Sequence, residues 1–139
     1  MNEYQWSDLR VGMQEEFKVS VTQEAMDAFV ELSRDSNPLH TDPAYAARAG
    51  FKGGVVFGLL TSSFYSRLVG VYLPGKHALL QGIDIDFVSP VYVGDTLLVL
   101  GEIIFLSDAC RRAEIKARIC KQGGQVVSKA TIRVGMHAT

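Results

Sequence analysis

The chain has little that would direct it to nucleic acid or to a membrane. Its 14 lysines and arginines stand against 15 aspartates and glutamates, so the formal net charge is -1. Because these charges are scattered rather than gathered in blocks, attraction to nucleic acid or to an anionic membrane surface is not expected. No apolar run approaches the roughly 20 residues that span a bilayer, and the first residues show no secretory pattern. These absences predict a cytoplasmic protein that binds neither nucleic acid nor membrane.

Cysteine is also scarce, with only Cys110 and Cys120 in the chain. Both fall in what reads as one extended strand, and at about 3.3 Å per residue they lie beyond disulfide reach of each other. Like Arg112 and Lys116, both cysteines stand at even-numbered positions. Because alternate residues of a strand share one face, both are predicted to lie on the polar face. We interpret them as reduced thiols without a nucleophilic role.

What the chain does contain is enough apolar material for one domain. Of its 139 residues, 47% are hydrophobic, which allows a real core. The first half reads as helices and loops and the second half as strands. This order is typical of an α+β domain with segregated elements.

The first clear helix is predicted to begin after Thr22, a candidate N-cap, and to end near Arg34. Its apolar residues at helical spacing predict a buried stripe, and they are Ala25, Phe29 and Leu32. Pro38 resists continuation of that helix. A second short helix is predicted to begin with Asp42 as N-cap and Pro43 as its first residue.

Residues 52–76 predict a long and largely buried helix. The stretch begins with two glycines and stops around Gly70 and Pro74. Its apolar residues at helical spacing are Val56, Leu59, Leu60 and Phe64. A further face carries the small polar residues Thr61, Ser62, Ser63 and Ser66. That face indicates either a close approach of another backbone or a function, and the pattern alone leaves both open.

From residue 78 onward the hydrophobic period changes to two, which predicts strands. Residues 95–106 are apolar at nearly every position, as expected for a central strand covered on both faces. Residues 113–119 and 126–134 alternate, and Gly123–Gly124 predicts a two-residue hairpin between them. The expected result is an antiparallel meander wrapped against the long helix.

One segment contains a pattern of candidate catalytic residues. Residues 33–46, SRDSNPLHTDPAYA, contain the order D-x-N-P-x-H-x-D-P. This closely resembles the signature of the MaoC-like hydratases, the group that includes the (R)-specific enoyl-CoA hydratases. VFGL at 56–59 and FVSPVYVGD at 87–95 also resemble the family, and the resemblance spans roughly residues 20–135. Arg34 stands where the family often has glycine, and Phe57 where it often has histidine.

The resemblance implies a fold and an activity. The fold would be a single hot-dog domain over residues 1–139, in which a curled antiparallel sheet wraps a long central helix. The activity would be hydration of trans-2-enoyl thioesters, carried by CoA or by acyl carrier protein, or the reverse dehydration. The family also pairs hot-dog domains, so a homodimer or a higher even oligomer is expected.

The residues suit that chemistry, which needs a base for water, an acid for Cα and a donor for the enolate oxygen. Asp35 and His40, on a turn around Pro38, could converge on one water. Family resemblance points to Gly58, near the start of the long helix, as the donor to the thioester oxygen. Asn37 would orient the loop or the water.

Substrate binding is expected along the same helix. Ser66 matches a family position associated with the acyl chain, and Ser62 shares its helix face. Asp42 is explained as a helix cap alone. No cofactor is needed, and no metal site is predicted because the remaining imidazoles, His77 and His137, lie in unrelated contexts.

Two other functions compete with the hydratase. A hot-dog thioesterase usually has a carboxylate on or near the long helix, whereas residues 56–73 contain neither Asp nor Glu. A non-catalytic subunit that only binds acyl chains is the third possibility, against which the Asp35–His40 pair argues.

Overall fold

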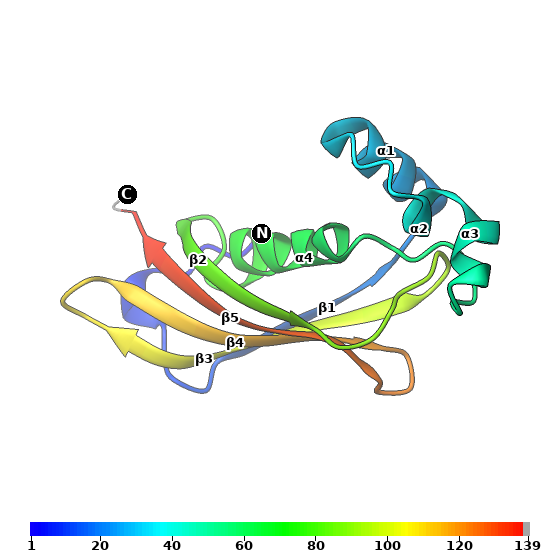
Figure 1. Cartoon of the computed structure of the whole chain (residues 1–139). Coiled ribbons are helices and arrows are strands. Elements are labelled where there is room, and N and C mark those ends of the chain that lie inside the picture. Colours follow the sequence, from blue (N-terminus) through cyan, green and yellow to red (C-terminus); the bar gives the residue numbers. More distant parts are fainter. Residues whose placement is uncertain (138–139) are drawn as a thin grey trace.

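A curled antiparallel sheet with a helix along its inner face forms the body of the protein (Figure 1). The computed structural model describes residues 1–137. Its strands are β1 (Gln14–Ser20), β2 (Ala78–Phe87), β3 (Thr96–Ser107), β4 (Arg112–Lys121) and β5 (Val126–Met136). They lie in the order β1-β3-β4-β5-β2, and every neighbouring pair is antiparallel. The strands β1 and β2 are therefore the edges of this sheet.

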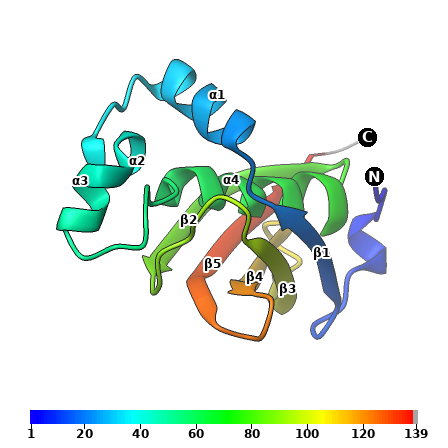
Figure 2. The same cartoon turned by 90° about the vertical axis from the view of Figure 1, so that its right-hand side faces the viewer.

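The helices fall into two groups. Those of the N-terminal half are η1 (Trp6–Asp8), α1 (Gln23–Ser33), α2 (Pro38–Thr41) and α3 (Pro43–Arg48). The central helix α4 (Gly58–Arg67) continues into a π-helical segment, η2 (Leu68–Tyr72). Figures 1 and 2 show α4 lying along the inner face of the sheet, with α1, α2 and α3 gathered beyond one end of it. The predicted α+β hot-dog fold is confirmed.

The core lies between α4 and the inward face of β3, β4 and β5. Its fully buried members include Leu97, Val99, Ile103, Ile115, Ile119, Ile132 and Val134 from the sheet and Tyr65 and Leu68 from the helical layer. Each such aliphatic side chain contributes roughly 1.5–3 kcal/mol when it leaves water. Gly101 permits the close approach, because a Cβ there would stand 2.7 Å from Leu68. The alternation predicted for residues 113–119 and 130–134 is confirmed.

Two residues predicted to lie on buried helix faces, Leu32 and Leu59, are exposed. On α1 the buried residue is Met26, with Phe29 and Val30 half-buried beside it, whereas Leu32 is 83% exposed. On α4 Leu59 is 67% exposed. Helical spacing identifies residues that share a face, but the neighbours of α1 and α4 decide which face is covered. The predicted cap at Thr22 is confirmed, since its side chain accepts from the Ala25 N–H at 3.1 Å.

The strand predictions need three corrections. β3 is second in the sheet and is covered on one face only, because Ile104 and Phe105 are exposed. Cys110 lies in the turn before β4, and Cys120 is buried because the pairing of β4 with β5 shifts at that residue. The hairpin is longer than two residues, since Lys121 N–H bonds to the Gln125 carbonyl. Both cysteines are free thiols, as predicted.

Within residues 1–137, every helix is too short or too polar to cross a membrane.

Candidate active site

The short helix α2 fixes the position of His40. Asn37 is its N-cap, accepting from the Leu39 N–H at 2.9 Å, and Pro38 is its first residue. The neighbouring segment is tied on by the Val55 N–H, which donates to the Leu39 carbonyl at 3.0 Å. In return, His40 Nδ1 lies 2.6 Å from the Val55 carbonyl oxygen. Because a carbonyl oxygen only accepts, Nδ1 carries the hydrogen and a neutral His40 presents a lone pair at Nε2.

Two clefts meet at His40. One, of about 440 Å³, lies between the start of α4 and the segment after β2, with Gly58, Thr61 and Phe87 in its wall. The other, of about 700 Å³, lies between α1 and the loop before β3. His40 is half-buried and belongs to the walls of both. An acid–base group at this position can therefore reach a molecule in either cleft.

The N-terminus of α4 opens into the smaller cleft. Phe57 is the N-cap but supplies no side-chain acceptor, and the Leu60 and Thr61 N–H groups bond to its carbonyl. Gly58 is the first residue of α4, where backbone N–H groups lack intrahelical partners and the helix dipole favours negative charge. A Cβ at Gly58 would stand 2.8 Å from the Phe87 ring, so the absent side chain is also used in packing.

Asp35 and Asn37 lie on the exposed loop between α1 and α2. Asp35 Oδ1 accepts from the Asn37 N–H at 3.1 Å, and the Asp35 N–H donates to Ser33 Oγ. Within residues 1–137, neither residue is part of the wall of the two clefts. The interpretation of Asp42 as a cap is confirmed, because its carboxylate accepts from the Ala44 and Tyr45 N–H groups.

The small polar face of α4 is largely used inside the helix. Ser62 Oγ donates to the Gly58 carbonyl at 2.7 Å, and Thr61 Oγ donates to the same oxygen at 2.8 Å. Thr61 is buried and forms part of the smaller cleft, whereas Ser66 is exposed. For the described chain, the walls of both clefts are made without Ser62 and Ser66.

The structure shows contacts of His40 that the sequence did not predict. Phe57 is 2% exposed, and its ring lies against the His40 imidazole with the centroids 4.1 Å apart. Phe29 packs against Phe57 in turn, at 4.7 Å. In the sequence, Phe57 belonged to the VFGL stretch and Phe29 to the predicted buried stripe of the first helix, and neither pattern indicated a contact with His40. Val55 had no signal, because it acts through its backbone oxygen.

Within residues 1–137, no three His, Cys, Asp or Glu side chains are grouped so that they could hold a metal ion.

The fold and the clefts together define a hot-dog protein with an imidazole and a helix N-terminus on one cavity. The chain belongs to the MaoC-like domain family, whose model matches residues 9–130.

Individual relatives agree with that membership. The chain is 39% identical over 109 residues to the (R)-specific enoyl-CoA hydratase of Aeromonas caviae, covering 77% of this chain and 81% of that protein. It is 34% identical over 122 residues to the 3-hydroxybutyryl-CoA dehydratase of Methylorubrum extorquens, covering 88% and 77%. The solved (R)-hydratase of A. caviae superposes with a TM-score of 0.88 at 35% identity, over 93% of this chain and 98% of that one.

Proposed function

We propose that this protein adds water to trans-2-enoyl thioesters to give (R)-3-hydroxyacyl thioesters, and catalyses the reverse dehydration. The observation that carries the proposal is the shared cleft, in which His40 and the first residue of α4 stand on one cavity. Relatives named as enoyl-CoA hydratase and 3-hydroxybutyryl-CoA dehydratase support the same reaction class.

The reaction needs three groups, which are a base, a hydrogen-bond donor and an acid. A base removes a proton from water while the oxygen attacks Cβ, and the electron pair of the double bond moves toward Cα and the thioester oxygen. The resulting enolate oxygen needs a donor, and an acid then protonates Cα. The lone pair at His40 Nε2 suits the proton transfer, and its other nitrogen is held by the Val55 carbonyl. The Gly58 amide suits the oxygen, where such a donor contributes about 3–4 kcal/mol to the transition state.

The remaining assignments are part of the same proposal. Asp35 is the second acid–base group, and Asn37 orients the loop as the cap of α2, which carries His40. Since Asp35 lies outside the walls of both clefts, its share in catalysis has to be measured separately from that of His40.

The deciding assay uses crotonyl-CoA. Loss of the enoyl absorbance without thiol release means hydration, release of free thiol means a thioesterase, and neither signal supports an acyl-binding subunit. We expect hydration, and we expect His40→Gln and Asp35→Asn each to lower it by two orders of magnitude or more, about the size of an acid–base contribution. Circular dichroism and melting temperature should stay close to wild type.

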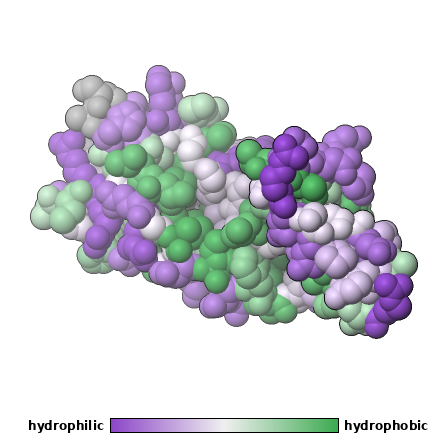
Figure 3. Space-filling model, turned by 45° about the horizontal axis from the view of Figure 1, so that its top comes forward, coloured by the Kyte–Doolittle hydropathy of each residue, from purple (hydrophilic) through white to green (hydrophobic). Residues whose placement is uncertain are grey.

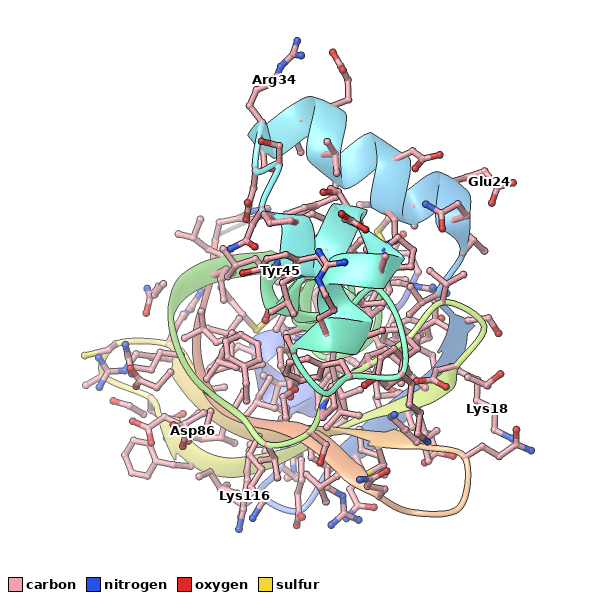
Figure 4. The ribbon with its side chains drawn as sticks, turned by 45° about the vertical axis from the view of Figure 1, so that its right-hand side comes forward. Lys18, Glu24, Arg34, Tyr45, Asp86 and Lys116 are labelled. Carbon is pink, nitrogen blue, oxygen red and sulfur yellow. The ribbon has the colours of Figure 1, made fainter. Side chains whose placement is uncertain are left out.

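A matched control is available on the opposite side of the molecule. Asp86 is exposed on β2, and Figure 4 shows it on the side of the sheet away from the helices. Asp86→Asn should keep full activity. If His40→Gln or Asp35→Asn retained more than about a tenth of the wild-type rate, the acid–base role of that residue would be refuted.

We also propose that the acyl tail runs along the Ser62–Ser66 side of α4. Ser66→Leu should then reduce kcat/KM more for C8 and C12 enoyl-CoAs than for C4, because each refused methylene costs about 0.8 kcal/mol of burial. Ser63→Leu, on an exposed position of the same helix, is the control. Equal loss across all chain lengths would mean that the tail does not pass Ser66.

A further proposal concerns assembly and compartment. Figure 3 shows an apolar band across the face that carries α4 and β2. Exposed apolar side chains on and beside these elements are Leu59, Leu79, Leu80, Phe87 and Val88. Because β2 is also an edge of the sheet, a second copy of the chain is the proposed partner, in a homodimer or a higher even oligomer. The cytoplasm is the proposed compartment, supported by the two free thiols.

A further inference from the structure

Three aromatic rings from three elements form a tilted stack beside the clefts. Phe29 comes from α1, His40 from α2, and Phe57 is the N-cap of α4. The Phe29 and Phe57 rings have centroids 4.7 Å apart at an interplanar angle of 40°, and the Phe57 and His40 rings are 4.1 Å apart at 31°. Phe57 is buried in the middle of this stack, while His40 keeps access to both clefts. The stack therefore covers one face of the imidazole with a ring that cannot easily move away.

The hydrogen bond from Nδ1 does not by itself fix the imidazole. With Nδ1 held 2.6 Å from the Val55 carbonyl, the ring can still tilt about the axis of that bond. A ring packed against the imidazole face removes this freedom, and the direction of the Nε2 lone pair is then set. With the two centroids only 4.1 Å apart, the rings are in van der Waals contact, so the imidazole cannot tilt toward Phe57.

Phe57 also joins the imidazole to the helix terminus. The residue after it is Gly58, and its own carbonyl accepts the first N–H bonds of α4. One residue therefore sets the plane of the acid–base group through its side chain and the start of the donor helix through its backbone. Catalysis of water addition requires both groups in one geometry, because reacting atoms must be held close to their reactive arrangement.

We propose that Phe57 is a positioning residue that fixes the plane and the tautomer of His40 relative to the N-terminus of α4. The consequence for turnover rests on the proposed hydratase function, whereas the effect on the imidazole does not. Phe29 supports Phe57 from α1, so its removal should act in the same direction and more weakly.

The test is Phe57→Leu, which removes the aromatic face and keeps an apolar side chain in the buried site. The first readout is the ¹⁵N spectrum of the imidazoles. The chain has three histidines, and the His40 signals are identified by their loss in His40→Gln. In wild type, neutral His40 should show a protonated Nδ1 and an unprotonated Nε2. In Phe57→Leu, a substantial share of the Nε2-protonated form should appear, because the ring can leave the Val55 carbonyl.

The second readout is turnover of crotonyl-CoA. Phe57→Leu should lower kcat by about tenfold and change KM by less than about twofold, because the residue positions a reacting group and does not bind substrate. Phe64→Leu is the matched control, since Phe64 is a half-buried ring of the same helix that packs against the core. It should leave both the spectrum and kcat unchanged.

The outcomes separate this proposal from the hydratase function. A His40 that stays fully Nδ1-protonated in Phe57→Leu would overturn it whatever the value of kcat, as would an equal effect of Phe64→Leu. If Phe57→Leu does not fold, Phe29→Leu decides, because a partial shift of the same signals supports the proposal and an unchanged spectrum overturns it. If wild type does not hydrate crotonyl-CoA, the hydratase function fails, and the nitrogen spectra still decide whether Phe57 positions His40.

Discussion

At the scale of single residues, Arg34 occupies a backbone conformation that favours glycine. It caps the C-terminus of α1 with φ 59°, a left-handed conformation that glycine adopts without penalty. A residue with a Cβ loses roughly 1–2 kcal/mol in that conformation. The ion pair of Arg34 with Glu31 is exposed on both sides and offsets little of this.

We therefore expect Arg34→Gly to raise the free energy of unfolding by up to about 1 kcal/mol, with part of the gain lost to the flexibility of glycine in the unfolded chain. Urea denaturation measures this change. Arg34→Ala removes the same ion pair and keeps the Cβ, so it should show no gain. An Arg34→Gly protein less stable than Arg34→Ala would contradict the explanation.

The absence of a side chain at Gly58 can be explained in two ways. One is room for the Phe87 ring, which would stand 2.8 Å from a Cβ at this position. The other is close approach of the thioester oxygen to the start of α4. Since Gly58 has no positive φ, alanine fits the backbone, and since Phe87 is 56% exposed, its ring can move aside.

The two explanations can be distinguished by the hydration rate of Gly58→Ala, made both in the wild-type chain and in a Phe87→Leu background. If the oxygen binds there, the alanine should lower hydration by about a hundredfold in both backgrounds, because its Cβ would keep the oxygen away from the N–H group and loss of a preorganised donor costs about that much. Recovery of activity in the double variant would mean that Gly58 serves only the packing of Phe87. Melting temperatures check that all three variants fold.

The residues of the candidate site were only partly predictable. The sequence motif placed His40 and Gly58, and both stand on one cleft. The roles of Phe57 and of the Val55 carbonyl could not be read from sequence, because a stack and a backbone hydrogen bond depend on how α2 and α4 meet in space. Asp35 was predicted to converge with His40, and this stays a prediction.

At the scale of elements, α4 is tied to the sheet by one buried polar contact. Tyr65 and Ser128 are fully buried, and their hydroxyl oxygens lie 2.7 Å apart, joining α4 to β5. Tyr65→Phe would leave the Ser128 hydroxyl without this partner, so we expect a loss of about 1–2 kcal/mol in the free energy of unfolding. The double variant Tyr65→Phe with Ser128→Ala removes both groups and should lose less than the single one.

The burial of Tyr65 also predicts a pH dependence. Burial raises the pKa of Tyr65 from 10.0 to about 12, and the bond to Ser128 only partly opposes this. The unfolded chain therefore releases the proton near pH 10 while the folded chain retains it. Stability contributed by Tyr65 is complete below pH 10 and falls as the pH rises toward 12, by at most about 3 kcal/mol. Denaturation at pH 9 and pH 11 should show a smaller decrease for Tyr65→Phe than for wild type, and an equal decrease would contradict this origin.

The capped starts of α1 and α3 were predictable from sequence, whereas the buried faces of α1 and α4 were predicted only in part. Thr22 and Asp42 cap helices through bonds to residues two or three positions away, so local sequence is sufficient. Whether Leu32 or Met26 faces the core depends on where α1 docks. The same limit applies to Leu59, which shares helical spacing with buried neighbours and is nevertheless exposed.

At the scale of the whole molecule, the alternation in β4 and β5 sufficed to predict a sheet wrapped on a helix. The predicted meander is wrong at β2, which pairs with β5 and not with β3, because hydrophobic pattern reports burial and not which strands pair. Residues 95–106 were expected to form a central strand covered on both faces, yet β3 is second in the sheet and exposes Phe105. An apolar outer face on an isolated chain is equally typical of a surface that a partner covers.

Because a partner chain could cover this exposed apolar face, self-association is the prediction that belongs to this scale. We expect sedimentation to show a dimer or a higher even assembly of the 15.2 kDa chain. If the β2 edge pairs the copies, Leu79→Glu should yield monomers, because Leu79 is exposed on that edge and a carboxylate there would lose its hydration in the interface. If the outer face of β3 pairs them, Phe105→Glu should do so instead. Val11→Glu, at an exposed residue between η1 and β1, is the control and should remain associated.

A wild-type chain that sediments as a monomer at nanomolar concentration and still hydrates crotonyl-CoA would refute the proposed assembly, because neither edge nor face would then be needed to complete the site.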